Sequence, residues 1–241
     1  MLLSTAFCPP VEYFALLAEY SSVYLEACES YCKQSWRNRC RILSANGPLD
    51  LSFPVVHHSR SGGSSPAGTA LHEQGPTTGV VPPLMEPRAA TGSGGALPPE
   101  RGPLITEVLV DYSVPWVAKM ERAIDSAYYS SPFFEFYRDA LFGILDSKPG
   151  TLWELDLLTI KWLCSKFGIG AEIIPTSCWQ EDAEGDYRGV IHPKRANTIL
   201  RDKGLENPYW QVFGDKFGFT PGLSALDLLF NEGPDSILYL K

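Results

Sequence analysis

The chain lacks a hydrophobic run long enough to cross a membrane. None of its apolar stretches approaches the ~18 consecutive residues that a membrane-spanning helix requires. Its first ten residues, MLLSTAFCPP, also lack the basic residues and the longer apolar core of an export signal. We therefore expect a cytoplasmic protein without a membrane span.

The sequence also lacks the motifs that accompany several common enzyme mechanisms. It contains no GxGxxG, no phosphate-binding P-loop, no GxSxG nucleophile elbow and no HExxH zinc motif. Six cysteines are present, and Cys28, Cys32 and Cys40 with a histidine at 57 or 58 could be combined into a metal site on paper. Their spacings match no common zinc pattern. We expect reduced thiols, no metal and no cofactor.

Positive charge is in short supply, with 20 Lys and Arg against 28 Asp and Glu and a net charge of −8. General nucleic-acid binding needs an extended basic surface, which an acidic chain does not provide. Nucleic acid is therefore excluded as an expected partner.

Aromatic residues are absent from residues 59–103, where 17 of 45 residues are Gly or Pro. Such a segment cannot bury enough apolar surface to offset the entropy lost on ordering. We interpret residues 59–103 as a disordered insertion, and residues 1–58 with 104–241 as a single domain. At 241 residues with 44% hydrophobic residues, the chain has ample material for a core.

The order of the expected elements predicts the α/β class. Apolar runs at 2–7 and 23–27 read as strands, and the 11–20 segment between them has helical spacing. This N-terminal βαβ unit is followed by a hairpin, with strands at 40–43 and 49–55 around Ala45-Asn46-Gly47. We expect the unit and the hairpin to form a mixed sheet, with a further strand at 105–112.

The remaining half is expected to be mainly helical. Ser113 and Ser131 are candidate N-caps, and Thr151 with Glu154 forms a capping box that opens a helix to about Phe167. A short strand is expected at 172–175 and polar, irregular chain at 177–208. The last helix begins near Ser224 and ends near 231–233.

The strongest functional signal is a basic cluster in the acidic chain. Residues 31–43 contain four cations and no acid. The cluster and its neighbours are Lys33, Trp36, Arg37, Asn38, Arg39 and Arg41. An extended segment would place the three arginines on one face, whereas a helical turn would bring Lys33 and Arg37 together. We predict a site for a small anionic ligand such as a nucleotide-sugar. The alternative is a solvated basic edge that pairs with surplus acids.

A second group of polar residues lies near the C-terminus, among aromatics. Gln211 and Asn231 are candidate binding residues, and Asp227 and His192 are candidate catalytic residues. Each has a structural alternative: Asp227 would complete the cap at Ser224, Asn231 would only end the helix, and His192 needs a nearby acid to serve as a base. The oligomeric state stays open.

These segments resemble the WbqC-like protein family. The resemblance rests on CPPVEYFALL, ESYCKQSWRNRCRILSANG, PLITEVLVDYSVPW and FTPGLSALDLLFNEGP, and KxxWxNR is its most specific part. It implies a bacterial protein of O-antigen and lipopolysaccharide biosynthesis. The implied activity is a transferase that moves a glycyl or other acyl group onto an amino-sugar; the alternative is a non-catalytic anion-binding or nucleotide-sugar-binding scaffold.

The opening topology is also similar to the nucleotidyltransferase-type α/β fold. That fold carries a histidine pair at the start of its first helix, where this chain has Val11, Glu12 and Tyr13. The similarity bears on topology and hardly on adenylyl transfer.

Overall fold

Three parallel strands form the N-terminal part of the fold in the computed structural model, which describes residues 1–56, 102–181 and 183–241. Strand β1 (Leu2–Ser4) continues into helix α1 (Val11–Leu17) and then into β2 (Ser22–Glu26), which pairs in parallel with β1. Strand β5 (Glu172–Pro175) pairs in parallel with the other edge of β2. The predicted βαβ unit is confirmed, and the sheet order is β1-β2-β5.

Helix α1 is shorter than its apolar pattern suggested, and every residue in it is buried. The helix ends at Leu17 because the chain must turn within four residues to begin β2 at Ser22. A helix that is buried on all sides is expected to be apolar all round. Glu12 in its first turn is therefore the exception that needs an explanation.

The hairpin is confirmed and forms its own two-stranded sheet. Strand β3 (Arg39–Ser44) pairs antiparallel with β4 (Gly47–Ser52), and Ser44 lies opposite Gly47 at the turn. Helices α2 (Trp116–Tyr128) and α7 (Ala225–Glu232) pack against β3. Leu49 on the outer strand remains partly exposed, so the predicted apolar face of β4 is buried only from Leu51 onward.

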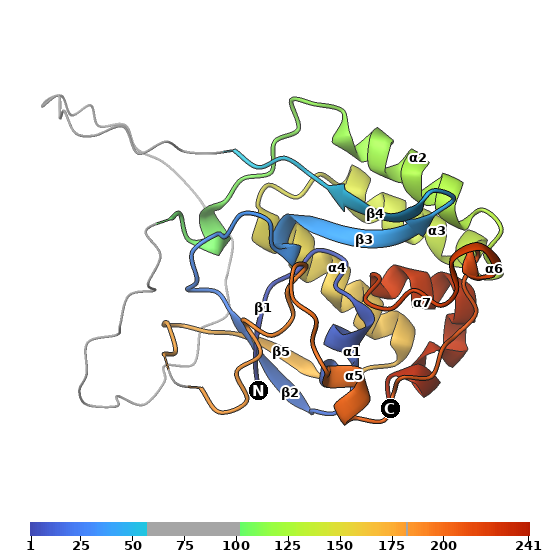
Figure 1. Cartoon of the computed structure of the whole chain (residues 1–241). Coiled ribbons are helices and arrows are strands. Elements are labelled where there is room, and N and C mark those ends of the chain that lie inside the picture. The colour runs from blue at the N-terminus through green and yellow to red at the C-terminus, as the bar shows by residue number, and fades with distance from the viewer. Residues whose placement is uncertain (57–101, 182) are drawn as a thin grey trace, which may run out of the picture.

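The C-terminal half is mainly helical, as expected. Besides α2 and α7 it contains α3 (Phe134–Asp146), α4 (Leu152–Phe167), α5 (Ile199–Asp202) and α6 (Gly214–Phe217). Three 3₁₀ turns complete the described elements: η1 (Trp36–Asn38), η2 (Ile105–Glu107) and η3 (Gly233–Tyr239). In Figure 1, α4 runs between the β3–β4 hairpin and the parallel sheet.

Three helix ends follow directly from their sequence. The capping box of α4 is present, since Thr151 Oγ1 accepts from the Glu154 N–H and the Glu154 carboxylate accepts from the Thr151 N–H. Gly168 ends the helix in the left-handed conformation, with φ of 67°. Gly233 follows α7 with φ of 56°, and a Cβ there would lie 2.5 Å from the Phe133 ring. Only glycine fits that position.

Three local predictions are wrong. Ser113 does not cap α2, which begins after Pro115, and Ser131 does not cap α3, which begins after Phe133. The Ser131 hydroxyl instead donates to Asn231 Oδ1 at 2.8 Å, because tertiary packing offers a buried partner. Residues 105–112 do not form a strand. Their backbone groups bind several different segments, as when the Val110 N–H donates to the Gly150 carbonyl, and so no continuous ladder forms.

The predicted insertion at 59–103 lies outside the described residues except for positions 102 and 103. Positions 57 and 58, considered above for a metal site, also lie outside them. In the described part of the chain, no helix has the length and apolar character needed to span a membrane.

Candidate functional site

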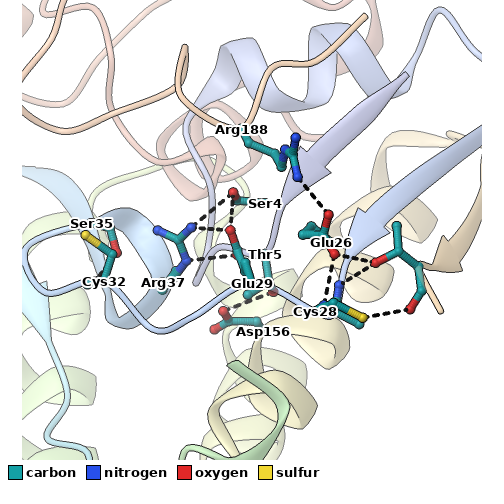
Figure 2. A network of polar contacts seen from close by, with 12 residues as sticks. Ser4, Thr5, Glu26, Cys28, Glu29, Cys32, Ser35, Arg37, Asp156 and Arg188 are labelled. Carbon is teal, nitrogen blue, oxygen red and sulfur yellow. Dashed lines mark hydrogen bonds and ion pairs between the residues drawn. The ribbon is translucent and has the colours of Figure 1, made fainter. Parts of the chain in front are cut away.

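The carboxyl ends of the parallel strands gather polar side chains from distant parts of the chain. Ser4 ends β1, Glu26 ends β2, and Glu29 and Thr176 follow β2 and β5. In open α/β sheets this edge is where ligands generally bind. Figure 2 shows that these side chains are joined by two networks, one through Arg37 and the other through Arg188.

The first network holds Arg37 against the acid that follows β2. The Arg37 Nε donates to Glu29 Oε1 at 2.9 Å, and its Nη2 donates to Glu29 Oε2 and to Ser4 Oγ. Ser4 Oγ in turn donates to Glu29 Oε2 at 2.8 Å. Both charged side chains are largely buried. Arg37 is thus bound in bidentate fashion by a carboxylate of the protein itself.

The second network holds the loop after β5 against the sheet edge. Arg188 Nη1 donates to Glu26 Oε2 at 2.8 Å, and Thr176 Oγ1 donates to Glu26 Oε1 at 2.5 Å. The same guanidinium binds Asp186 and lies over the Trp179 ring, 4.1 Å from its centroid. These contacts fix the chain that leads to His192.

A buried acid lies beneath the first network. The Thr5 hydroxyl donates to Asp156 Oδ2 at 3.1 Å, and Asp156 Oδ1 has no hydrogen-bond partner among the described residues. Burial raises the pKa of Asp156 well above its usual value. Burial therefore acts against the charged form of this carboxyl group.

Next to this edge the protein has a cleft of about 780 Å³. Its walls come from η1, β3, the first turn of α1, the 192–207 segment and the chain around Tyr209 and Phe219. Five basic side chains line it: Arg41, His192, Lys194, Arg195 and Arg201. Two acids, Glu12 and Glu206, also line it. The cleft has the volume and the mixed lining of a small-molecule site.

Trp36 and His192 connect the cleft to the sheet edge. Both line the cleft, and both also line a smaller cavity of about 20 Å³ bounded by Ser4, Arg37 and Arg188. The smaller cavity has room for about one water molecule. The two networks therefore lie behind the wall of the cleft that Trp36 and His192 form, and only the small cavity separates them from it.

His192 is surrounded by basic groups. Its Nδ1 accepts from the Lys194 N–H at 3.1 Å, so that the neutral ring carries its proton on Nε2. Burial lowers the pKa of His192, and the charges of Arg195, Lys194 and Arg37 lower it further. The ring is thus neutral near pH 7 and presents a hydrogen-bond donor. In the described part of the chain, no acid contributes to the pKa shift of this histidine.

Glu12 is the most deeply buried charged group of the cleft, with 7% of its surface exposed. Asn197 Nδ2 donates to Glu12 Oε1 at 3.0 Å, while Oε2 has no partner among the described residues. Burial raises the pKa of Glu12, and its hydrogen bonds only partly offset that effect. A carboxylate here is held in place at one oxygen and left free at the other.

Asp227 lies behind the cleft wall and is 1% exposed. Its Oδ2 accepts from the Tyr209 hydroxyl at 2.7 Å and from Gln211 Nε2 at 3.0 Å. Burial raises the pKa of Asp227 to about 6, against the opposing effect of these donors. Tyr209 lines the cleft, so Asp227 reaches a ligand only through this tyrosine.

The predicted basic cluster divides among three places. Trp36 and Arg41 line the cleft, and the Arg41 guanidinium lies over the Trp36 ring, 5.5 Å from its centroid. Arg37 joins the sheet-edge network. Arg39 and Arg41 both approach Asp50 across the hairpin, at 3.8 and 2.6 Å. Four adjacent cations therefore do not converge on one point, because the turn at η1 separates them and carboxylates of the protein bind three of them.

The other predicted site residues have local partners or lie away from the cleft. Asn38 Nδ2 donates to the Phe53 carbonyl at 2.8 Å, which ties η1 to the end of the hairpin. Asn231 accepts from Ser131 and so does more than end α7. Ser224 caps α7 through the Leu226 N–H without help from Asp227. Lys33 is exposed and lines neither cavity.

Several residues of the site were missed as site residues at the sequence level. Glu12 carried a signal, as the one acid in an otherwise apolar helix. The pair Lys194 and Arg195 was visible as a basic spot beside His192. Asn197 and Arg201 gave no distinctive pattern, because only the fold brings the 192–207 segment over α1.

The sequence pattern of the WbqC-like protein family matches residues 5–64 and 98–204, which is most of the chain. The matched residues include Glu12, the η1 turn and the basic side of the cleft, and end before Tyr209 and Asp227. No curated protein and no solved structure matches the chain significantly. Among the described residues, no group of three or more His, Cys, Asp or Glu side chains could hold a metal ion.

Proposed function

Since the chain belongs to the WbqC-like protein family, we propose that it is a transferase of bacterial surface-polysaccharide biosynthesis. The substrate is a phosphate-bearing amino-sugar, such as a nucleotide-sugar, and the group transferred is glycyl or another acyl group. O-antigen assembly is the pathway that the family resemblance implies.

The basic lining of the 780 Å³ cleft supports this proposal most strongly. Lys194, Arg195 and Arg201 are exposed, and no salt bridge to them is found within the described residues. Cations that converge without intramolecular acids repel one another, and an anionic ligand relieves that repulsion. Arginine also offers bidentate contacts to a phosphate, which fixes the ligand in one orientation.

The residues predicted for the site take different roles in this proposal. Trp36 and Arg41 contact the ligand, and His192 donates a hydrogen bond from Nε2. Arg37, Asn38 and Arg39 hold the η1 turn that carries Trp36. Asp227 and Gln211 act through Tyr209, while direct ligand contacts of Lys33 and Asn231 stay predictions.

The test is calorimetric titration of the purified protein with UDP, dTDP, GDP, ADP and pyrophosphate, with uridine as the phosphate-free control. We expect binding that depends on the phosphates and weakens with added salt. Arg195→Ala should weaken it by about tenfold, the effect of one charge-assisted contact. Arg122→Ala on α2, an exposed arginine outside the cleft and without a salt bridge in the described part of the chain, should leave the affinity unchanged. Absence of binding to all five phosphates would refute the proposal.

Transfer is tested separately from binding. The protein is incubated with a nucleotide-linked amino-sugar and an activated acyl donor, and mass spectrometry reports the acylated sugar. Binding without transfer would favour the second candidate, a non-catalytic nucleotide-sugar-binding protein. The basic surroundings of His192 favour that candidate, because they make the histidine a weak base.

A further inference from the structure

Glu12 occupies an unusual position for an acid in the cleft. It lies in the first turn of α1, a helix that is otherwise apolar and fully buried. A buried carboxylate normally has a cation or several hydrogen-bond donors, because an unpaired charge in the interior is strongly unfavourable. The side-chain donor to Glu12 is Asn197, and the structure shows no ion pair to this acid within the described residues.

The Glu12 side chain belongs to the lining of a large cavity, and one of its carboxyl oxygens, Oε2, is buried without a partner among the described residues. Asn197 holds the other oxygen, and the Asn197 Oδ1 in turn accepts from the Ile199 N–H at 3.2 Å. The carboxyl group is thus oriented from the protein side, while its second oxygen keeps an unused acceptor next to the cleft.

The charges around the cleft define the ligand that would satisfy it. Lys194, Arg195 and Arg201, which have no salt bridge within the described residues, favour an anionic group. Glu12 requires a hydrogen-bond donor, and an amino group meets that requirement best because its positive form also compensates the buried charge. A molecule with a phosphate and an amino group satisfies both parts of the cleft, whereas a simple phosphate satisfies only one.

We propose that Glu12 binds the amino group of the acceptor sugar and takes its proton during transfer. This inference rests on the proposed function, in which the cleft holds a phosphate-bearing amino-sugar. Burial raises the pKa of Glu12, which makes the carboxylate a stronger base than an exposed glutamate. Asn197 is a positioning residue, since it holds the carboxyl group and reaches the ligand only through it.

The proton balance of the step is simple. The amine nitrogen forms a bond to the carbonyl carbon of an activated acyl donor, such as a thioester or an acyl phosphate. The bond between that carbon and the leaving group breaks, and the leaving group departs with the electron pair. The proton released by the nitrogen goes to the carboxylate of Glu12.

The experiment compares two ligands that differ at one position, glucosamine 1-phosphate and glucose 1-phosphate. Affinities are measured by calorimetry for the wild-type protein, for Glu12→Gln and for Glu19→Gln. Glu19 follows the same helix but lies outside the cleft and pairs with Lys203. The wild type and Glu19→Gln should both bind the amino-sugar about tenfold more tightly, the effect of one charge-assisted contact. Glu12→Gln should lose this preference while it keeps its affinity for glucose 1-phosphate.

Two controls separate this effect from a folding defect. Glu12→Gln keeps the shape of the side chain and its contact with Asn197, and its circular dichroism and thermal unfolding should match the wild type. Glu12→Asp keeps the charge and should retain part of the amine preference. In the acyl-transfer assay, Glu12→Gln should lose activity by roughly 10²-fold or more, as expected for a lost proton acceptor.

The outcomes distinguish the inference from the proposed function. If both sugar phosphates bind and Glu12→Gln keeps the amine preference, the inference is wrong and the phosphate-binding cleft stands. If the wild type binds both sugar phosphates equally well, the inference is likewise wrong and the phosphate-binding cleft stands. If neither sugar phosphate binds, the proposed function fails and the inference fails with it.

Discussion

The sheet edge and the cleft both contain arginine residues, but at the sheet edge their charges are paired with carboxylates, whereas in the cleft they face a cavity. At the sheet edge, Arg37 and Arg188 are buried and bound by Glu29 and Glu26. In the cleft, Arg195 and Arg201 are exposed and face a cavity. A buried cation with an internal carboxylate stabilises the architecture, whereas an exposed, unpaired cation in a concave wall is available to a ligand. Charge alone does not distinguish a binding site; its pairing does.

The buried acids also differ in whether a cation, a neutral donor or no partner binds each carboxyl oxygen. Glu26 is fully buried and bound by a guanidinium, whereas Asp227 is buried and bound only by neutral donors. Glu12 has the fewest partners of the three, with one neutral side-chain donor and one buried oxygen that has no partner among the described residues, and its side chain lines the cleft. The three groups form a series from structural ion pair to candidate ligand contact.

Removal of the buried cation Arg188 should give the largest change in the free energy of unfolding. Arg188→Ala leaves Glu26, whose side chain is 0% exposed, without its charge partner. We expect a loss of about 3–5 kcal/mol in the free energy of unfolding, measured by urea denaturation. Arg195→Ala in the exposed loop should change it by no more than about 0.5 kcal/mol.

A double variant tests the cause of that loss. Glu26→Gln combined with Arg188→Met removes both charges and should recover much of the stability, because no unpaired charge remains buried. If Arg188→Ala costs no more than Arg195→Ala, the ion pair is not the contact that holds the loop after β5.

Asp227, the buried acid that is bound only by neutral donors, should make the free energy of unfolding depend on pH. The pKa of Asp227 rises from 3.8 in the unfolded chain to about 6 in the folded protein. Between these values the folded state binds the proton of Asp227 more tightly than the unfolded state does. The contribution of this proton to the free energy of unfolding is therefore complete below pH 3.8 and is lost as the pH rises through 6. The lost stability is about 3 kcal/mol, at 1.36 kcal/mol for each pKa unit.

Asp227→Asn removes this titration. The difference in unfolding free energy between wild type and variant should therefore shift by about 3 kcal/mol in favour of the variant between pH 3 and pH 8. Tyr209→Phe removes a donor to the carboxylate, so it should raise the pKa and extend the wild-type decline to higher pH. Parallel curves for wild type and Asp227→Asn would show that Asp227 does not titrate in this range.

Within the basic cluster, we expect a smaller effect that falls on nucleotide binding and differs between two arginines. Arg41 lines the cleft, whereas Arg39 points to Asp50 and lies outside the lining. Arg41→Ala should weaken nucleotide binding by about tenfold, or 1.4 kcal/mol, and Arg39→Lys should leave it within about twofold. Equal losses at both positions would show that the cluster acts as one unit, as the sequence first suggested.

The smallest effect is expected outside both regions. Replacement of residues 59–103 by a short Gly/Ser linker should preserve the fold and ligand binding, because the segment lacks aromatic residues and is rich in Gly and Pro. Shortening the connection should stabilise the protein by about 1 kcal/mol, at roughly 0.6 kcal/mol for each halving of its length. A loss of cooperative unfolding would show that the segment contributes to the core.

Local signals were sufficient for most of the elements. The capping box at Thr151, the glycine stop at Gly168 and the hairpin turn at Asn46 act within a few residues, so their sequence predicts them correctly. The caps predicted at Ser113 and Ser131 are wrong. Ser131 has a partner 100 positions away, and such a contact cannot be read from neighbouring residues.

For the site, the residue types along the chain are enough to identify a basic cluster around Trp36, a basic spot at His192 and one acid in an apolar helix. They determine neither which cation meets which acid nor which face opens to a cavity. Both depend on the folded chain, since the pairing of β2 with β5 brings residues some 150 positions apart into hydrogen-bond contact at one sheet edge. The physical reason is that side-chain identity sets which interactions a residue can make, whereas pairing and desolvation depend on distances that only the folded chain defines.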